Sequence, residues 1–167
     1  MCCFSRPVDR VAETNIFARR SRKGHQFIVY SMTLETSAAV AMILPLPVPH
    51  RSGEKSVTFI NLEEYGSFFT DARTGFPSPK KAAKGAGRGR PSQGVDRLLE
   101  VVSVGSFEAS FVPTVADFAR LDERFRLPDG TFEKLPGYKD WGFAVFKLKK
   151  GKKKIHPMAF EMPTRWP

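Results

Sequence analysis

The alternation of residue types between positions 26 and 36 places the strongest constraint on the fold of this chain. Apolar side chains occupy positions 28, 30, 32 and 34, whereas positions 31, 33 and 35 are polar. Successive side chains of a strand point to opposite faces of a sheet, so this pattern predicts a half-buried β-strand. A shorter run at 15–19 and a turn around Gly24 precede it. We therefore expect residues 15–36 to form a hairpin that packs against an N-terminal strand.

Further strands are predicted where short apolar runs are bounded by turn residues. The run 39–44 is apolar throughout, so both of its faces should be covered, and the prolines at 45, 47 and 49 then fix an extended exit. The last section is expected to be a hairpin, with arms at 141–148 and 155–162 and a lysine-rich tip at 149–154. The remaining predicted strands are 57–60, 98–104 and 107–112.

Two short helices are predicted from capping patterns. Asn61 followed by Glu64 indicates a helix that runs to about residue 69. Thr114 followed by Asp117 indicates a second helix, whose inner face would carry the apolar side chains of Phe118, Leu121 and Phe125. Together these elements predict an α+β fold dominated by mainly antiparallel sheets, with two or three short helices.

Length and charge limit the class of protein further. A chain of 167 residues fits a single domain over 1–167, and its longest apolar stretch, 38–48, is too short to span a bilayer. The two cysteines are adjacent and cannot join distant segments, and no signal segment opens the chain, so a reducing cytoplasmic location without membrane association is expected. The formal net charge of +10 favours acidic or polyanionic partners.

The positive charge is concentrated in two segments, 80–90 and 147–154. The first lies within 77–94, which is rich in Pro, Gly, Ser, Lys and Arg and is expected to be a flexible loop. Basic residues interleaved with glycine can contact a phosphate backbone, and Phe68, Phe69 and Phe76 beside the loop could stack on bases or simply fill the core. The candidate nucleic-acid contacts are Lys80, Lys81, Lys84, Arg88, Arg90, Lys152 and Lys153.

The first residues, Met-Cys-Cys-Phe, contain every thiol of the chain. Removal of Met1 is common before a small residue and would give Cys2 a free α-amine, which can act as the base for its own thiol. Cys2 and Cys3 could instead bind a soft metal, form a redox pair, or serve as small apolar residues of a first strand. His156 is the histidine expected to assist as base or ligand, and Asp9 is an acid that could orient a thiol or an imidazole.

No Cys-x-x-Cys or His-Glu-x-x-His spacing occurs, so neither a metal nor another cofactor is predicted. Any metal that did bind would have Cys2, Cys3 and His156 as its ligands.

Several segments resemble a family of bacterial proteins that open with Met-Cys-Cys-Phe and to which no activity is assigned. The resemblance covers most of the chain outside 77–94, at residues 1–5, 41–49, 105–113, 116–122, 141–147 and 156–161. The N-terminus is also similar to the choloylglycine-hydrolase type of N-terminal nucleophile enzymes, with Cys2, Phe17 and Arg19 as the matching positions. That second resemblance implies Cys2 as nucleophile and Arg19 as a further catalytic residue.

Three functions are consistent with these observations. The first is a hydrolase or transferase that acts on an amide or acyl bond of a small-molecule or peptide substrate through Cys2. The second is a basic protein that binds nucleic acid or ribonucleoprotein through 80–90 and 149–154. The third is a scaffold or interaction protein.

Overall fold

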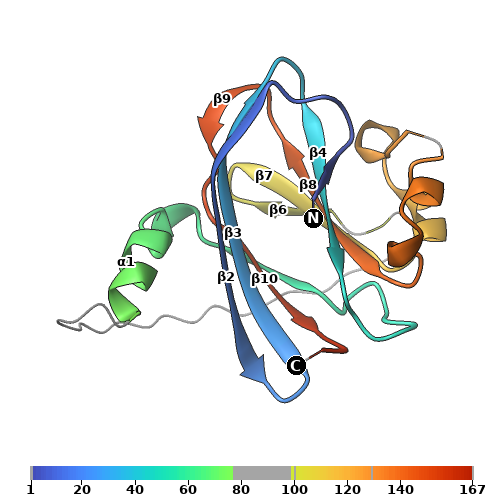
Figure 1. Cartoon of the computed structure of the whole chain (residues 1–167), viewed down its shortest axis with the longest axis horizontal. Helices are drawn as coiled ribbons and strands as arrows, with labels where there is room; N and C mark the ends of the chain where they lie inside the picture. The colour runs from blue at the N-terminus through green and yellow to red at the C-terminus, as the bar shows by residue number, and fades with distance from the viewer. Residues whose placement is uncertain (1, 77–98, 100, 129, 167) are drawn as a thin grey trace.

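Two antiparallel sheets packed face to face form the body of the protein (Figure 1). The computed structural model describes residues 2–76, 99, 101–128 and 130–166. Sheet 1 has the order β1 (Cys3–Phe4), β4 (Val40–Leu46), β8 (Gly142–Leu148), β7 (Phe107–Val112) and β6 (Val101–Val104). Sheet 2 has the order β2 (Arg10–Arg22), β3 (His25–Thr36), β10 (Met158–Pro163) and β5 (Thr58–Asn61), and β9 (Gly151–Lys154) also pairs with β3. The β-dominated α+β class is thereby confirmed.

The hairpin predicted for residues 15–36 is present as β2 and β3 and is longer than expected. Its turn contains Gly24, whose φ of 71° is a conformation that glycine adopts without strain. The predicted inward face of β3 is also confirmed, because Tyr30, Met32 and Leu34 are buried in the core between the sheets. The pairing of β2 with β3 shifts register between Ala12 and Asn15, so the outer strand contains a bulge.

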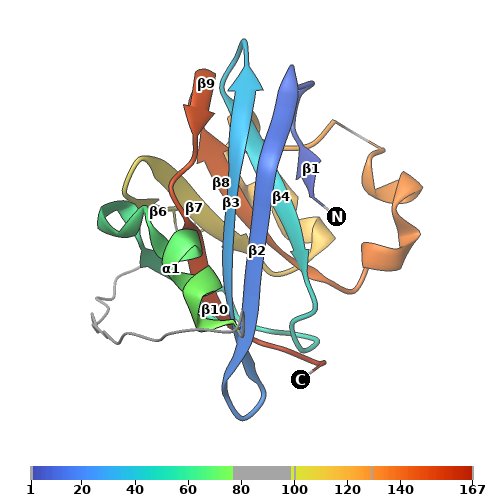
Figure 2. The same ribbon diagram turned by 60° about the vertical axis from the view of Figure 1, so that its left-hand side comes forward.

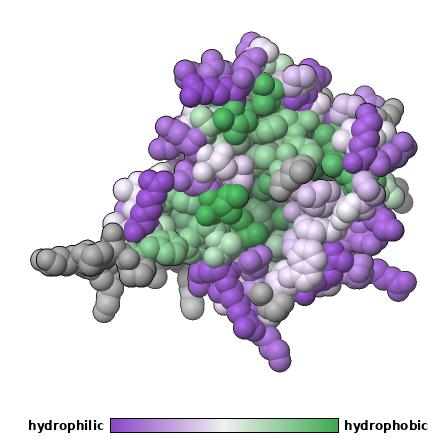
Figure 3. Space-filling view, viewed as in Figure 1, coloured by the Kyte–Doolittle hydropathy of each residue, from purple (hydrophilic) through white to green (hydrophobic). Residues whose placement is uncertain are grey.

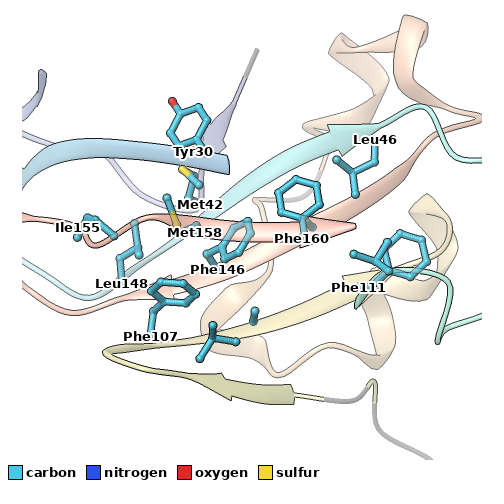
Figure 4. Close-up of a cluster of buried hydrophobic side chains, with 14 of the residues drawn as sticks. Tyr30, Met42, Leu46, Phe107, Phe111, Phe146, Leu148, Ile155, Met158 and Phe160 are labelled. Carbon is cyan, nitrogen blue, oxygen red and sulfur yellow. The ribbon is translucent and has the colours of Figure 1, made fainter. Parts of the chain in front are cut away.

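The core between the sheets is built around aromatic rings and methionines (Figure 4). Phe146 on β8 of sheet 1 is fully buried and meets Phe59 on β5 of sheet 2, with ring centroids 5.6 Å apart at 84°. Phe160 on β10 lies beside both rings, at 6.1 Å from Phe146 and 6.2 Å from Phe59. The two contacts of Phe146, with Phe59 and with Phe160, cross from one sheet to the other and hold the sandwich together.

A second apolar cluster covers the outer face of sheet 1. Phe118, Leu121 and Phe125 are buried there, as predicted, together with Ile43 and Phe143 of the sheet. The covering segments are short 3₁₀ helices rather than one α-helix, because their turns close with bonds three residues apart, such as Asp117 N–H to the carbonyl of Thr114 at 3.1 Å. They are η2 (Val115–Arg120), η3 (Glu123–Phe125), η4 (Phe132–Lys134) and η5 (Pro136–Tyr138).

The helix predicted from Asn61 to about residue 69 is divided in two. Asn61 does cap a turn, since its Oδ1 accepts the N–H of Glu63 at 2.9 Å, but only the 3₁₀ segment η1 (Glu63–Tyr65) follows. The α-helix α1 (Phe68–Gly75) begins afresh after Gly66, a residue type that disfavours helix continuation. α1 lies outside sheet 2, on the side away from sheet 1 (Figures 1 and 2).

The hairpin predicted for the last section is wrong. β8 pairs with β4 and β7 in sheet 1, whereas β10 pairs with β3 and β5 in sheet 2. The lysine-rich segment between them is not a tip but contains β9, which adds to β3 with Glu35 opposite Lys152. The physical reason is burial, because nearly every side chain of β8 is buried and such a strand requires neighbours on both edges and cover on both faces.

Within the described residues, no helix combines the length and apolar character needed to cross a membrane. The segment 77–94, predicted to be a flexible loop, lies outside the described part of the chain.

Candidate functional site

The two N-terminal thiols are directed to opposite faces of sheet 1. Strand β1 pairs with β4 so that Cys3 lies opposite Ile43 and Phe4 opposite Met42. Cys2 and Phe4 pack on the core between the sheets, whereas Ile43 belongs to the cluster on the other face. Because side chains alternate along a strand, Cys2 and Cys3 are separated by the sheet rather than paired.

Cys2 has the phenol of Tyr30 as its neighbour. The Sγ atom of Cys2 lies 3.8 Å from the hydroxyl oxygen of Tyr30, within hydrogen-bonding distance for sulfur. Burial, reinforced by the nearby Cys2 sulfur, raises the pKa of Tyr30 to about 12. Burial also raises the pKa of the Cys3 thiol. Tyr30 is therefore protonated at neutral pH and can donate a hydrogen bond to the sulfur of Cys2, while Cys3 is disfavoured as a thiolate.

His156 is held in a different set of contacts. Its Nε2 accepts the backbone N–H of Ser106 at 3.2 Å, and its Nδ1 lies 3.2 Å from the carbonyl oxygen of Pro157. The ring also stacks on Phe107, with centroids 4.5 Å apart. This arrangement matches a neutral imidazole protonated on Nδ1, with both nitrogens occupied. Within the described chain, His156 and Cys2 share no hydrogen-bonding partner.

The other predicted catalytic residues, Asp9 and Arg19, make contacts with groups other than Cys2. Asp9 is exposed, and its backbone N–H bonds to the carbonyl of Glu35. The guanidinium of Arg19 lies 5.5 Å from the ring centre of Phe27 on sheet 2. No group of three or more His, Cys, Asp or Glu side chains placed to hold a metal ion occurs among the described residues, so Cys2, Cys3 and His156 do not form a ligand set there.

A groove with a different composition lies between α1 and sheet 2. Phe68 anchors the helix against Phe17 of β2, with ring centroids 5.5 Å apart at 79°. Beside this contact lie two hollows of about 260 and 290 Å³, which share Asn15, Phe69 and Arg73 as lining residues. We call the two adjacent hollows together the α1 groove. Its other lining residues are Ile16, Phe17, Ala18, Ser31, Gly66, Thr70, Ala72, Phe76, Lys154, Ile155, His156 and Pro157.

The α1 groove is positively charged. Arg73 donates from Nη2 to the Oδ1 of Asn15 at 2.8 Å, a neutral partner that leaves its charge intact. Neither Arg73 nor Lys154 has an ion pair in the described chain, and no described lining residue carries a carboxylate. Lys152, by contrast, lies 3.6 Å from the carboxylate of Glu35.

Exposed aromatic and aliphatic side chains continue the groove. Phe76 is 60% exposed although its ring lies 6.4 Å from that of Phe17, and Ile16 on β2 is 65% exposed. Apolar surface accordingly lies beside α1 in the space-filling view (Figure 3). The groove thus combines two cations that have no ion pair among the described residues with hydrogen-bonding side chains and accessible ring faces, a set of groups that can bind single-stranded nucleic acid.

The sequence identified only part of this groove. Phe69, Phe76 and His156 were singled out as candidates, but Arg73, Asn15 and Ser31 were not. Phe69 and Arg73 are four residues apart and therefore share a helix face, so a helix predicted in the right register would have indicated the pair. Outside the described residues lie Lys80, Lys81, Lys84, Arg88 and Arg90, and also the side chain of Lys153.

Searches against protein-family models, curated proteins and solved structures found no match for this chain.

Proposed function

We propose that the protein binds single-stranded nucleic acid in the α1 groove. The proposal rests on the combination of cations and aromatic rings in one groove. Arg73 and Lys154 have no ion pairs in the described chain, and the described lining contains no carboxylate. The rings of Phe69 and Phe76 line the same groove. The net charge of +10 adds a long-range attraction for a polyanion.

The groups divide naturally into two roles. Arg73 and Lys154 would neutralise backbone phosphates, while Phe76, the more exposed ring, would offer its face to a base. Asn15 on β2 and Thr70 on α1 supply polar atoms in the same hollow. Contacts of this kind recognise the phosphate backbone and the flat face common to all bases, so binding should depend strongly on salt and weakly on sequence.

The test is fluorescence anisotropy of a labelled oligothymidylate across a series of salt concentrations. The variant Arg73→Gln/Lys154→Gln should bind at least tenfold more weakly. Its plot of log affinity against log salt should be shallower by about 1.4, because each lost phosphate contact on a single strand removes about 0.7 from the slope. Arg22→Gln is the matched control, because it removes a surface charge that is already paired with Glu161 at 2.9 Å.

Two outcomes contradict the proposal. One is equal loss of affinity in the double variant and in Arg22→Gln, which would indicate general charge attraction rather than a groove. The other is unchanged affinity in Phe76→Ala, because loss of a stacking ring should cost about 1–3 kcal/mol of binding free energy.

A second function is favoured by the contact between Cys2 and Tyr30. We propose as this alternative that Cys2 acts as a nucleophile toward an amide or acyl bond, with the protonated Tyr30 donating a hydrogen bond to its thiolate. The α-amine freed by removal of Met1 would serve as the base, since both nitrogens of His156 are occupied.

Intact mass and iodoacetamide labelling test this alternative. We expect loss of Met1 and faster alkylation at Cys2 than at Cys3, because burial raises the pKa of Cys3. Tyr30→Phe should slow the labelling of Cys2, and Cys2→Ala should leave the fold intact. A retained Met1 with two unreactive thiols would contradict the alternative and leave both cysteines as packing residues.

A further inference from the structure

Another hollow, of about 400 Å³, lies beyond the end of β4 and shares no lining residue with the α1 groove. Three segments form its walls: residues 48–51 after β4, Pro113 and Thr114 after β7, and residues 139–141 before β8. A hollow of this volume falls within the range of small-molecule sites. Segments far apart in sequence converge here because β4, β7 and β8 are neighbours in sheet 1.

An aromatic cluster lies beside this hollow, and Trp141 is the member of the cluster that forms part of its wall. Trp141 lines it and meets the ring of Trp166 at 5.2 Å and that of Tyr138 at 5.0 Å, both edge to face. Arg165 lies 6.0 Å from the ring centre of Trp141 and 5.8 Å from that of Trp166. Trp141 and Trp166, the two tryptophans of the chain, are therefore in contact beside this hollow. An indole held by such contacts offers a rigid face on which a flat ring can stack.

The charged groups around the hollow have an excess of positive charge. Two cationic residues, Arg51 and Lys139, line the hollow, and Asp140 is the one described lining residue that carries a carboxylate. Behind them, Nη1 of Arg165 lies 3.0 Å from Nε2 of His50, so His50 is neutral and protonated on Nδ1 when it accepts this bond. The Nε of Arg165 is buried without a hydrogen-bond partner, and its guanidinium has no ion pair in the described chain. Arg165 does not line the hollow, but its charge adds to the positive potential beside Trp141.

The backbone at Arg51 supports a binding role. Its φ of 62° lies in the left-handed region, which is strained for a residue other than glycine. The turn is fixed by Ser52, whose N–H and hydroxyl both donate to the carbonyl of Pro49, at 3.2 and 2.7 Å. Glycine would be preferred for the backbone alone, so the arginine side chain is present at some expense of stability.

From these observations we infer that the hollow binds a small molecule in which a flat ring is joined to a phosphate group, as in a nucleoside monophosphate. The ring stacks on Trp141, and the phosphate is held by Arg51 and Lys139. The inference does not rest on the proposed binding of nucleic acid, because the two sites have no residue in common.

The experiment is a titration of the full chain with adenosine monophosphate, followed by tryptophan fluorescence. We expect a saturable change, with adenosine and inorganic phosphate each binding at least tenfold more weakly than the joined molecule. Benzoate distinguishes a carboxylate ligand from a phosphate ligand: tighter binding of benzoate than of adenosine monophosphate would overturn the assignment to phosphate.

Two variants make the test specific. Arg51→Gly should bind adenosine monophosphate at least tenfold more weakly while its resistance to urea stays equal or rises, since glycine relieves the backbone strain. Arg73→Gln, in the α1 groove, should bind it as the unmodified chain does. The absence of saturable binding, unchanged binding in Arg51→Gly, or loss of binding in Arg73→Gln would each overturn the inference, the last by placing the ligand in the α1 groove.

Discussion

The contact between Phe59 and Phe146 tests the packing of the two sheets most directly. Phe146 has two edge-to-face partners at 5.6 Å, Phe59 at 84° and Phe107 at 82°. Each such pair contributes about 0.5–1.5 kcal/mol beyond the burial of its surface. Leucine keeps the position apolar but removes both ring pairs, so Phe146→Leu should lower the free energy of unfolding by about 1–3 kcal/mol.

A double-mutant cycle isolates the contact that crosses between the sheets. Urea unfolding of Phe59→Leu, Phe146→Leu and the double variant should give a coupling of about 0.5–1.5 kcal/mol. The control cycle pairs Phe59 with Phe118, which lies in the other cluster, on the outer face of sheet 1, and should be additive. A coupling between Phe59 and Phe146 no larger than the control, within about 0.3 kcal/mol, would refute the face-to-face arrangement of β5 and β8.

Two further predictions concern Tyr30 and Gly142. Because the pKa of Tyr30 is raised to about 12 from an ordinary value of 10.0, the folded chain keeps a proton that the unfolded chain has lost. The free energy of unfolding should therefore fall as the pH rises from 10 to about 12. Absorbance titration should show a late phenolate step that is missing in Tyr30→Phe. If all phenolate titration were complete near pH 10, this prediction would be wrong. A Cβ at Gly142 would lie 2.7 Å from the ring of Phe111, so Gly142→Ala should cost about 1–3 kcal/mol in urea unfolding. Gly53→Ala, which meets no atom within 4 Å, should change stability little, and equal effects of the two substitutions would contradict the steric argument.

The strands were predictable from sequence because burial imposes local patterns on them. Alternation along β3 and the continuous apolar run of β4 each reflect how many faces of the strand are covered. The partner of each strand was not predictable in the same way. β8 and β10 are close in sequence and similar in composition, so their local pattern is that of a hairpin. They belong to different sheets because β8 pairs with β4 and β10 pairs with β3, and these partners are distant in sequence.

The candidate sites were less predictable than the fold. Arg73 belongs to the α1 groove because the helix folds against β2, where the side chain of Asn15, 58 residues earlier in the chain, accepts its hydrogen bond. Trp141 and Arg165 meet through the same kind of long-range approach. For the thiols, closeness in sequence was misleading. Cys2 and Cys3 are adjacent and therefore suggested a pair, but side chains alternate along a strand and these two are directed to opposite faces of sheet 1.

The bulge in β2 has a consequence for behaviour in solution. β2 is an outermost strand of sheet 2 and has 13 residues, long enough to offer a template for pairing with another copy of the chain. The bulge interrupts this edge at Glu13, where φ is 51°, and the carbonyl of Glu13 accepts instead from the side chain of Asn15 at 2.7 Å. A second strand could follow only one part of the edge before its register failed. The same irregularity that places Asn15 beside Arg73 therefore also protects the chain against edge-to-edge aggregation.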